Sequence, residues 1–448
     1  MKTVAFHNLG CKVNTYEIEM MQQNARNAGW KIVEFTQKAD IYVINTCSVT
    51  NIADRKSRQM LHKARKNNPG AIVVAVGCYA QTDAAGALSD NAIDIVVGNN
   101  HKAELVKIVE EFEASRIKKA VVDDISLPME YEDYGITGSS ERTRVDIKIQ
   151  DGCDQFCTFC IIPFARGRIR SRRPDLVTDE IRKLADSGFK EVVLTGIHLS
   201  SYGLDLHDKK TSYNLVAVED YTNEDLIDVI EKVAQIDGIE RIRLGSLEPR
   251  IITSRFLERI SAIDKVCPHF HLSLQSGCDE TLKRMNRRYT TSEYASGVAL
   301  IREFYEHPAI TTDIIVGFPG ESEEEFAKTC AFVDDIEFYE THIFKYSRRK
   351  GTVADTMPSQ LTEAVKAARS DVLEEKNRIH MKKFMEAVIG RSEEILTEEQ
   401  IDIEGKNYTV GHTKNYIMMA LEGAYEKNIL IKGEVSGFLQ NNIMLLKT

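Results

Sequence analysis

Three cysteines stand close together in the stretch Gly152-Cys153-Asp154-Gln155-Phe156-Cys157-Thr158-Phe159-Cys160. Three thiolates at this spacing can bind three irons of a cubane [4Fe–4S] cluster, which leaves the fourth iron open to another ligand. Zinc is the alternative, but a structural zinc site needs four protein ligands and no Cys or His follows nearby. The spacing therefore favours an iron–sulfur cluster on Cys153, Cys157 and Cys160.

Cys11, Cys47 and Cys78 each follow a strand-like run of residues, at 4–8, 41–45 and 71–76. Ligands of open parallel sheets bind at the carboxyl ends of the strands, where these three thiols can converge. Any one of them alone is more typical of an ordinary buried thiol. The three together predict a second three-cysteine cluster, whereas Cys267, Cys278 and Cys330 have no partner spacing and are interpreted as structural.

The alternation of strand and helix patterns defines the fold class, α/β. Residues 1–120 predict a doubly wound parallel sheet. Residues 114–143 contain many turn-forming residues, among them Pro128 and Gly138, and indicate a boundary. Six further strand candidates then alternate with helices and predict an incomplete (β/α)6 barrel with its chemistry at the strand ends; they are residues 144–150, 191–195, 241–245, 269–274, 311–317 and 342–346.

The C-terminal pattern changes to short strands separated by Gly and Asn. After a helical stretch at 363–388, strand candidates at 408–412, 416–421, 429–435 and 442–446 predict a small antiparallel β-barrel. The expected domains are therefore residues 1–120, 140–375 and 385–448.

The later strands of the predicted central barrel end in polar or glycine-containing turns. Glu248, Gln275 and Asp313 are candidates for binding cofactor or substrate at this rim. Basic residues are expected to add positive charge there; they are Lys283, Arg284, Arg287, Arg288, Arg348, Arg349 and Lys350. An arginine-rich loop also follows the cysteines, with Arg166, Arg168, Arg170, Arg172 and Arg173.

Composition limits the class of protein. The chain has 448 residues, nine cysteines and a net charge of −10. No apolar run approaches the ~20 residues of a membrane span, and the N-terminus has no signal-peptide layout, so we expect a cytoplasmic protein with no membrane partner. Cysteines in that compartment indicate metal or redox chemistry, and any nucleic-acid contact must come from local basic patches.

The cysteine stretch resembles the radical S-adenosylmethionine (SAM) superfamily, and the chain as a whole resembles its methylthiotransferase family. The superfamily likeness implies that the open iron chelates the methionine end of SAM and that Phe159 packs near the adenine. The segments that carry the family likeness are Asn8 to Asn14, Asn45 to Cys47, Val76 to Cys78, Gly152 to Arg173, Ser273 to Gly277 and Asp313 to Glu321.

This resemblance implies two [4Fe–4S] clusters, SAM, and a C-terminal TRAM domain. The first triplet's cluster would cleave SAM, and the resulting radical would attack carbon 2 of an adenine. The cluster on Cys11, Cys47 and Cys78 would carry the sulfur, which a separate SAM molecule methylates. Gly196 is the candidate for the methionine end of SAM. Implied partners are a tRNA anticodon loop, a sulfur donor and an electron donor such as flavodoxin or ferredoxin.

Three branches of the family differ in substrate: isopentenyl-adenosine in tRNA, a ribosomal-protein aspartate, and threonylcarbamoyladenosine beside the anticodon. The segments Leu9 to Asn14, Ser246 to Pro249 and Ile161 to Gly167 are most similar to the third branch. The other two branches stay open as alternatives. So do a radical SAM methylase that inserts no sulfur and a non-catalytic iron–sulfur RNA-binding protein.

Overall fold

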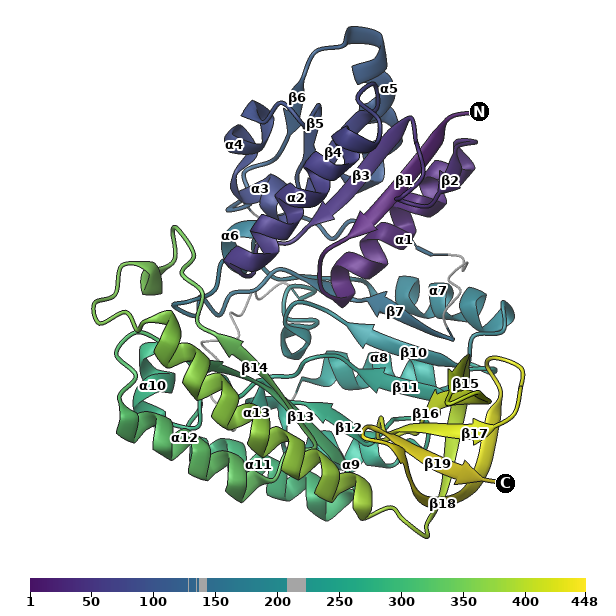
Figure 1. The fold of residues 1–448 in the computed structure, drawn as a ribbon, viewed down its shortest axis with the longest axis vertical. Coiled ribbons are helices and arrows are strands. Elements are labelled where there is room, and N and C mark those ends of the chain that lie inside the picture. Colours follow the sequence, from purple (N-terminus) through teal and green to yellow (C-terminus); the bar gives the residue numbers. More distant parts are fainter. Residues whose placement is uncertain (128, 134, 137–142, 208–222) are drawn as a thin grey trace.

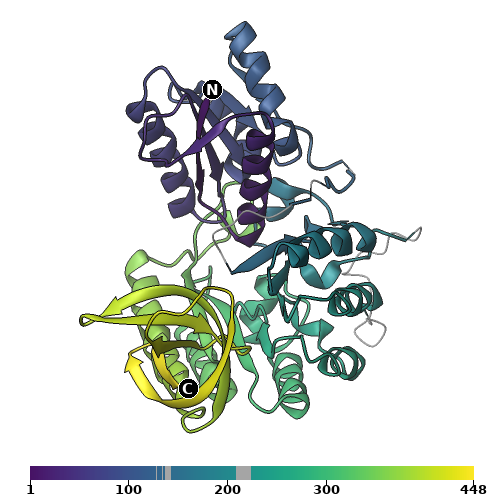
Figure 2. The ribbon, with the colours of Figure 1, turned by 90° about the vertical axis from the view of Figure 1, so that its right-hand side faces the viewer.

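The computed structural model describes residues 1–127, 129–133, 135–136, 143–207 and 223–448. Three parts follow one another along the chain: an N-terminal parallel sheet, a central curved sheet with outer helices, and a small C-terminal barrel (Figures 1 and 2). Pro128, Gly138 and the expected boundary at residue 140 lie outside the described residues.

The N-terminal sheet is fully parallel, with strand order β2-β1-β3-β4-β5-β6. Its strands are β1 (Thr3–Asn8), β2 (Lys31–Val33), β3 (Ile41–Thr46), β4 (Ile72–Gly77), β5 (Ile95–Val97) and β6 (Lys119–Val121). Its helices are α1 (Lys12–Asn27), α2 (Asn51–Asn67), α3 (Cys78–Thr82), α4 (Ala84–Ser89), η1 (Lys102–Glu104) and α5 (Leu105–Ser115). The outer strands β2 and β6 were not predicted, because these edge strands are only partly buried and lack the fully buried apolar run of β5.

The central part has two three-stranded parallel sheets, ordered β11-β10-β7 and β12-β13-β14. Hydrogen bonds from Leu247 N to His271 O and from Ser273 N to Leu247 O join them along β11 and β12. The strands are β7 (Arg144–Lys148), β10 (Glu191–Thr195), β11 (Arg241–Leu244), β12 (His269–His271), β13 (Ala309–Val316) and β14 (Glu340–Lys345), and the pair β8 (Gln150–Asp151) and β9 (Arg170–Ser171) lies beside them.

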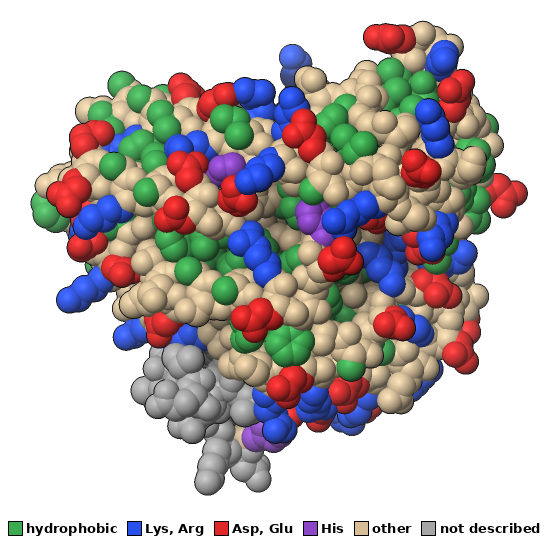
Figure 3. Space-filling model, turned by 90° about the horizontal axis from the view of Figure 1, so that it is seen from below, with side chains coloured by type: hydrophobic (Ala, Val, Ile, Leu, Met, Phe, Trp, Pro, Cys, Tyr) green, Lys and Arg blue, Asp and Glu red, His purple; other side chains and the backbone are tan. Residues whose placement is uncertain are grey.

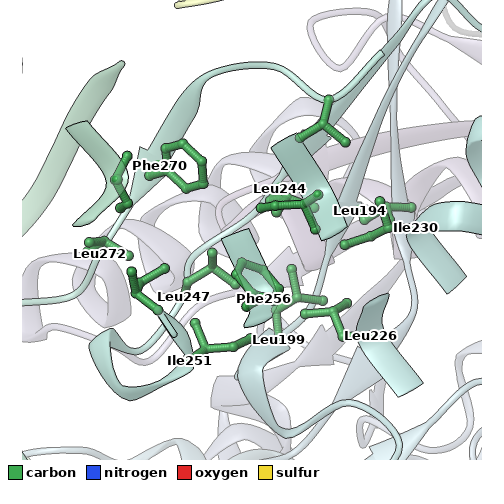
Figure 4. Packing of buried hydrophobic residues seen from close by; sticks show 14 of the residues in the cluster. Leu194, Leu199, Leu226, Ile230, Leu244, Leu247, Ile251, Phe256, Phe270 and Leu272 are labelled. Carbon is green, nitrogen blue, oxygen red and sulfur yellow. The ribbon is translucent and has the colours of Figure 1, made fainter. Parts of the chain in front are cut away.

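Helices cover the outer face of the central sheet and bury a continuous apolar core. Phe256 of α9 lies among Leu194, Leu244 and Leu247 in Figure 4. Capping boxes begin two of the helices, at Thr290 and Ser322. The helices are α6 (Ile162–Arg166), α7 (Pro174–Asp186), η2 (Leu199–Ser201), α8 (Glu224–Ala234), η5 (Pro249–Ile251), α9 (Ser254–Ser261), α10 (Asp279–Arg284), α11 (Thr291–Phe304), α12 (Glu323–Ile336), η6 (Val353–Asp355) and α13 (Glu363–Glu386).

The C-terminal strands form a closed barrel in the order β15-β16-β17-β19-β18. These strands are β15 (Ser392–Ile403), β16 (Lys406–His412), β17 (Met418–Glu422), β18 (Leu430–Gln440) and β19 (Ile443–Lys447). The expected small antiparallel barrel is present in its other strand pairs, but it needs one correction, because β17 and β19 pair in parallel. A closed ring of five strands cannot alternate direction throughout, so one pair must be parallel. Among the described residues, no helix combines the length and apolar character that a bilayer crossing requires.

Gly152, next to Cys153, occupies a backbone position that leaves no room for a side chain. Its φ is +71°, and a Cβ there would lie 1.8 Å from the Arg168 carbonyl oxygen. Gly188 also has positive φ, +93°, but no heavy atom lies within 4 Å of its Cβ position. Gly188→Ala should therefore cost about 1–2 kcal/mol of stability. Gly152→Ala should cost about 1–3 kcal/mol more, because the backbone must move.

Urea unfolding followed by circular dichroism compares the two glycine variants. The midpoint should fall further for Gly152→Ala than for Gly188→Ala. Equal shifts would show that the close approach to Arg168 does not constrain the loop.

Candidate active site

Cys11, Cys47 and Cys78 lie at the carboxyl ends of β1, β3 and β4, which are neighbours in the sheet. Cys11 is the N-cap of α1, and Cys78 is the first residue of α3. Burial first, and then the neighbouring Cys78 and Cys11 thiols, raise the pKa of Cys47 to about 12. The three thiols, far apart in sequence, therefore share one edge of the sheet.

The second triplet lies in the loop between β8 and α6. Cys153 and Cys157 are buried, and Arg287 donates from Nη1 to the Cys157 Sγ at 3.2 Å. Burial, followed by the Cys157 thiol, raises the pKa of Cys160 to about 12, and Cys78 of the first triplet adds to this shift. The two triplets are therefore within electrostatic reach of each other. The arrowheads of β1 and β3 in Figure 1 point toward the central part.

Two polar side chains bridge the triplets. Asn14 Oδ1 lies 3.5 Å from the Cys11 Sγ and accepts a 2.9 Å hydrogen bond from Arg166 of α6. Asn99 donates to the Ala165 carbonyl at 2.6 Å and lies 3.9 Å from the Cys78 Sγ. The helix that follows Cys153–Cys160 is thus bonded directly to residues beside Cys11 and Cys78.

Arg166 is the centre of a buried ion cluster. Its Nη1 lies 2.8 Å from a carboxylate oxygen of Glu17 and 3.1 Å from one of Asp151. Lys148 bonds both carboxylates, at 3.1 Å and 2.6 Å, and Lys102 bonds Glu17. Burial alone raises the pKa of Glu17, but Arg166 and the two lysines outweigh it and hold this pKa well below its usual range.

Several of the arginines near the cysteines and at the expected basic rim are buried or paired with carboxylates, whereas Arg168, Arg173 and Arg348 are more than half exposed. Arg166 and Arg172 are fully buried, and Arg172 pairs with Glu180 and Asp133. Further along the chain the basic side chains are paired too: Arg170 with Asp151, Arg284 with Glu325, Arg348 with Asp355 and Arg349 with Asp54. On the face shown in Figure 3, basic and acidic side chains are interspersed.

A cavity of about 220 Å³ brings together Phe159, Cys160, Gln275 and Asp313. Gln275 has a φ of +69°, and its amide bonds the Asp313 carbonyl at 2.8 Å. The rest of the lining includes Val49 and Thr50 after Cys47 and Phe344 to Ser347 at the end of β14. Sequence reasoning missed Val49, Thr50 and Phe344, whereas Tyr346 and Ser347 belong to a polar turn expected at the rim after the last predicted strand.

Gly196 and Glu248 do not line this cavity. A Cβ on Gly196 would lie 2.8 Å from the side chain of Gln150, whose amide braces the Gly152 carbonyl. Glu248 is buried and accepts from the Arg250 Nε at 3.0 Å. Gly196 thus packs against Gln150, just before the cysteine loop, and Glu248 is paired with Arg250; neither is part of the cavity wall.

Two family models match the chain: one described as uncharacterized protein family UPF0004, over residues 3–98, and the radical SAM superfamily, over residues 147–333. A solved structure of the radical SAM methyltransferase TsrM from Kitasatospora setae is similar, with a TM-score of 0.52. It is 16% identical, and the match covers 77% of this chain and 73% of that one, so it shows the fold alone. Together with the cysteine loop, these findings define a radical SAM enzyme.

Relatives narrow the family further. The threonylcarbamoyladenosine tRNA methylthiotransferase MtaB of Bacillus subtilis is 40% identical over 94% of this chain and 91% of its own length. A tRNA-2-methylthio-N(6)-dimethylallyladenosine synthase of Pelotomaculum thermopropionicum is 33% identical over 92% of this chain and 90% of its own. The chain belongs to the methylthiotransferase family of radical SAM enzymes, near its threonylcarbamoyladenosine branch.

Arg166→Met should strongly destabilise the protein. It leaves Glu17 and Asp151 buried with fewer cations, and breaking a buried pair costs about 3–5 kcal/mol. The matched control is Arg182→Met, because Arg182 and its partner Asp179 are both more than half exposed. That pair should contribute about 0–1 kcal/mol.

Urea unfolding of the two arginine variants under identical conditions measures the difference. A midpoint for Arg166→Met no lower than that for Arg182→Met would contradict a stabilising role of the ion cluster.

Proposed function

We propose that this enzyme transfers a methylthio group to carbon 2 of N6-threonylcarbamoyladenosine next to the tRNA anticodon. The observation that carries the proposal is the meeting of two cysteine triplets from two different sheets, linked through Arg166 and Asn99. One radical-generating triplet would suffice for an enzyme that only abstracts hydrogen. A second triplet beside it supports a reaction that also delivers sulfur.

The donor sets fit two [4Fe–4S] clusters, one on Cys11, Cys47 and Cys78 and one on Cys153, Cys157 and Cys160. Each set offers three thiols, as a cubane with one open iron requires. Arg287 donates to the Cys157 sulfur, and hydrogen bonds to sulfur stabilise the thiolate form that binds iron. The buried cations around Arg166 favour thiolate in the other set.

The cavity beside Cys160 is the proposed SAM site. Phe159 offers an aromatic surface there, and Gln275 and Asp313 offer polar groups. The cluster and SAM together would supply one-electron chemistry that acid–base groups cannot perform on an unactivated ring C–H bond. The chain's own residues hold and orient the reactants. Gly196, because its missing side chain leaves room for Gln150, would keep the cysteine loop in place.

The proposal also requires partners: a tRNA anticodon loop, a sulfur donor, and an electron donor such as flavodoxin or ferredoxin. The five-stranded C-terminal barrel is the proposed TRAM domain, within proposed boundaries of 1–120, 140–375 and 385–448. A tRNA substrate and reduced thiols are consistent with a cytoplasmic location. Higher identity to the MtaB relative than to the dimethylallyladenosine synthase favours threonylcarbamoyladenosine over isopentenyl-adenosine or a ribosomal-protein aspartate.

Anaerobic reconstitution of cysteine variants tests the two-cluster proposal. The wild type should bind about eight irons per chain. Replacing Cys11, Cys47 and Cys78 with Ala should halve that content yet preserve reductive cleavage of SAM to 5′-deoxyadenosine. Replacing Cys153, Cys157 and Cys160 should also halve the iron and abolish cleavage. Cys267→Ala, a buried thiol outside both triplets, is the matched control. Unchanged iron in the first variant would exclude the second cluster.

Mass spectrometry of nucleosides from tRNA tests the substrate. Cells that lack the protein should lose the 2-methylthio group of threonylcarbamoyladenosine and keep the unmodified nucleoside. Complementation with the wild type should restore it, and complementation with the Cys11→Ala variant should not. Loss of the methylthio group from isopentenyl-adenosine instead would reassign the branch, and intact tRNA modification would point to the ribosomal protein.

A further inference from the structure

Three side chains of metal-ligand type meet on the central sheet: His271 of β12, Asp313 of β13 and His342 of β14. The strands are neighbours, and the register pairs Asp313 directly with His342. Ile314, the next residue along β13, belongs to the apolar core under the helices. Because successive residues of a strand point to opposite faces, Asp313 faces away from that core, into the curve of the sheet. We call these three residues the His–Asp–His trio.

The ligand atoms of the trio are close enough to share one ion. One ligand atom from each residue lies within 4.8 Å of the other two. His271 Nε2 and Asp313 Oδ2 are 3.4 Å apart, longer than the usual 2.7–3.2 Å hydrogen bond. Two ligands bound at 2.0–2.2 Å around a tetrahedral metal are separated by roughly 3.4 Å. The imidazole rings of His271 and His342 stack, with centroids 5.7 Å apart.

A neighbouring oxygen holds the His271 imidazole as an outer partner holds a metal ligand. The His271 Nδ1 lies 2.9 Å from the Oγ1 of Thr311, which is 2% exposed. When Nδ1 donates to that hydroxyl, the lone pair is on Nε2, which faces Asp313. Glu340 Oε1, at 3.9 Å from the Nδ1 of His342, is too far for a hydrogen bond, so only His271 has such a partner among the described residues. An oxygen on the second ring nitrogen is the usual arrangement around a metal-bound histidine.

We propose that the His–Asp–His trio binds one divalent first-row transition metal ion, of the Zn²⁺ or Fe²⁺ class. Two imidazoles and one carboxylate suit these ions, whereas Mg²⁺ and Ca²⁺ take all-oxygen sites. Three protein ligands leave at least one position for water or substrate. The side chains of His271, Asp313 and His342 are 14%, 29% and 44% exposed, so an ion can enter.

The site borders the proposed reaction cavity, since Asp313 also lines the cavity that holds Phe159, Cys160 and Gln275. An ion on the trio would therefore present its open position near that cavity, where an oxygen donor of a bound ligand can coordinate it. The site itself follows from the three side chains alone and does not depend on methylthio transfer. The alternative to a metal site is a His271–Asp313 ion pair with His342 stacked on His271.

Anaerobic calorimetric titration of cluster-loaded protein with ZnCl₂, and separately with Fe²⁺, tests the site. The wild type should take up one ion per chain beyond the cluster iron. His271→Gln and Asp313→Asn should weaken binding by more than about 100-fold. Thr311→Val, which removes only the outer partner, should weaken it about 10–100-fold. His62→Gln is the matched control, because His62 forms a surface His–Asp pair with Asp90 at 2.8 Å.

Cluster iron and circular dichroism of each variant establish that the fold persists, and His342→Gln, at the most exposed position, provides a second route if His271→Gln fails to fold. Zinc bound by thiols outside the trio should be the same in all variants. A loss of affinity in the trio variants that is absent in His62→Gln therefore reports zinc on the trio. The proposal would be overturned if the wild type bound no ion beyond the cluster iron. It would also be overturned if both His271→Gln and His342→Gln bound the ion as tightly as the wild type does. The readout is bound metal, so this failure would leave the proposed methylthio transfer untouched.

Discussion

The buried ion cluster around Arg166 is the constraint on which the arrangement of both cysteine triplets depends. Four cations, Lys102, Lys148, Arg166 and Arg170, face two carboxylates, Glu17 and Asp151. Glu17 and Lys102 come from the N-terminal sheet, and the rest from the central part. Buried ions are tolerated only when the geometry satisfies them. The two parts therefore have one strongly preferred relative orientation, and that orientation brings the end of β1 to the loop after β8.

The ion cluster holds more cations than carboxylates, so besides joining the two parts it also affects the ionisation of the nearby thiols. Burial alone opposes ionisation of the thiols, as the raised pKa of Cys47 shows. Cations stabilise thiolate, and Arg166 is among the groups that counter this rise. In the second triplet, Arg287 donates a hydrogen bond to the Cys157 sulfur. Two thiolate sets would bring negative charge to a place that already holds uncompensated positive charge. The charges at the interface of the two sheets therefore match those of the two thiolate sets.

Sequence alone could predict the features that depend on local periodicity. The apolar runs at 4–8, 41–45 and 71–76 became β1, β3 and β4, and because parallel strands end at one edge, Cys11, Cys47 and Cys78 had to lie near each other. The same reasoning located all six central strands. It did not reveal the burial of Arg166 and Arg172, because nothing in the local pattern of an arginine-rich loop identifies the carboxylates that pair with it. Glu17, which pairs with Arg166, lies 149 residues earlier in the chain.

Register marks the limit of such reasoning most clearly at the His–Asp–His trio. His271 and His342 had no motif spacing, and Asp313 was expected at the rim only because of its place near a strand end. Their meeting requires that β12, β13 and β14 pair as they do, with His271 opposite Thr311 and Asp313 opposite His342. A shift of one residue in any strand would turn its ligand toward the apolar core. The core residues Phe270, Ile314 and Ile343, which each follow or precede a trio member, are therefore what aims the polar side chains inward.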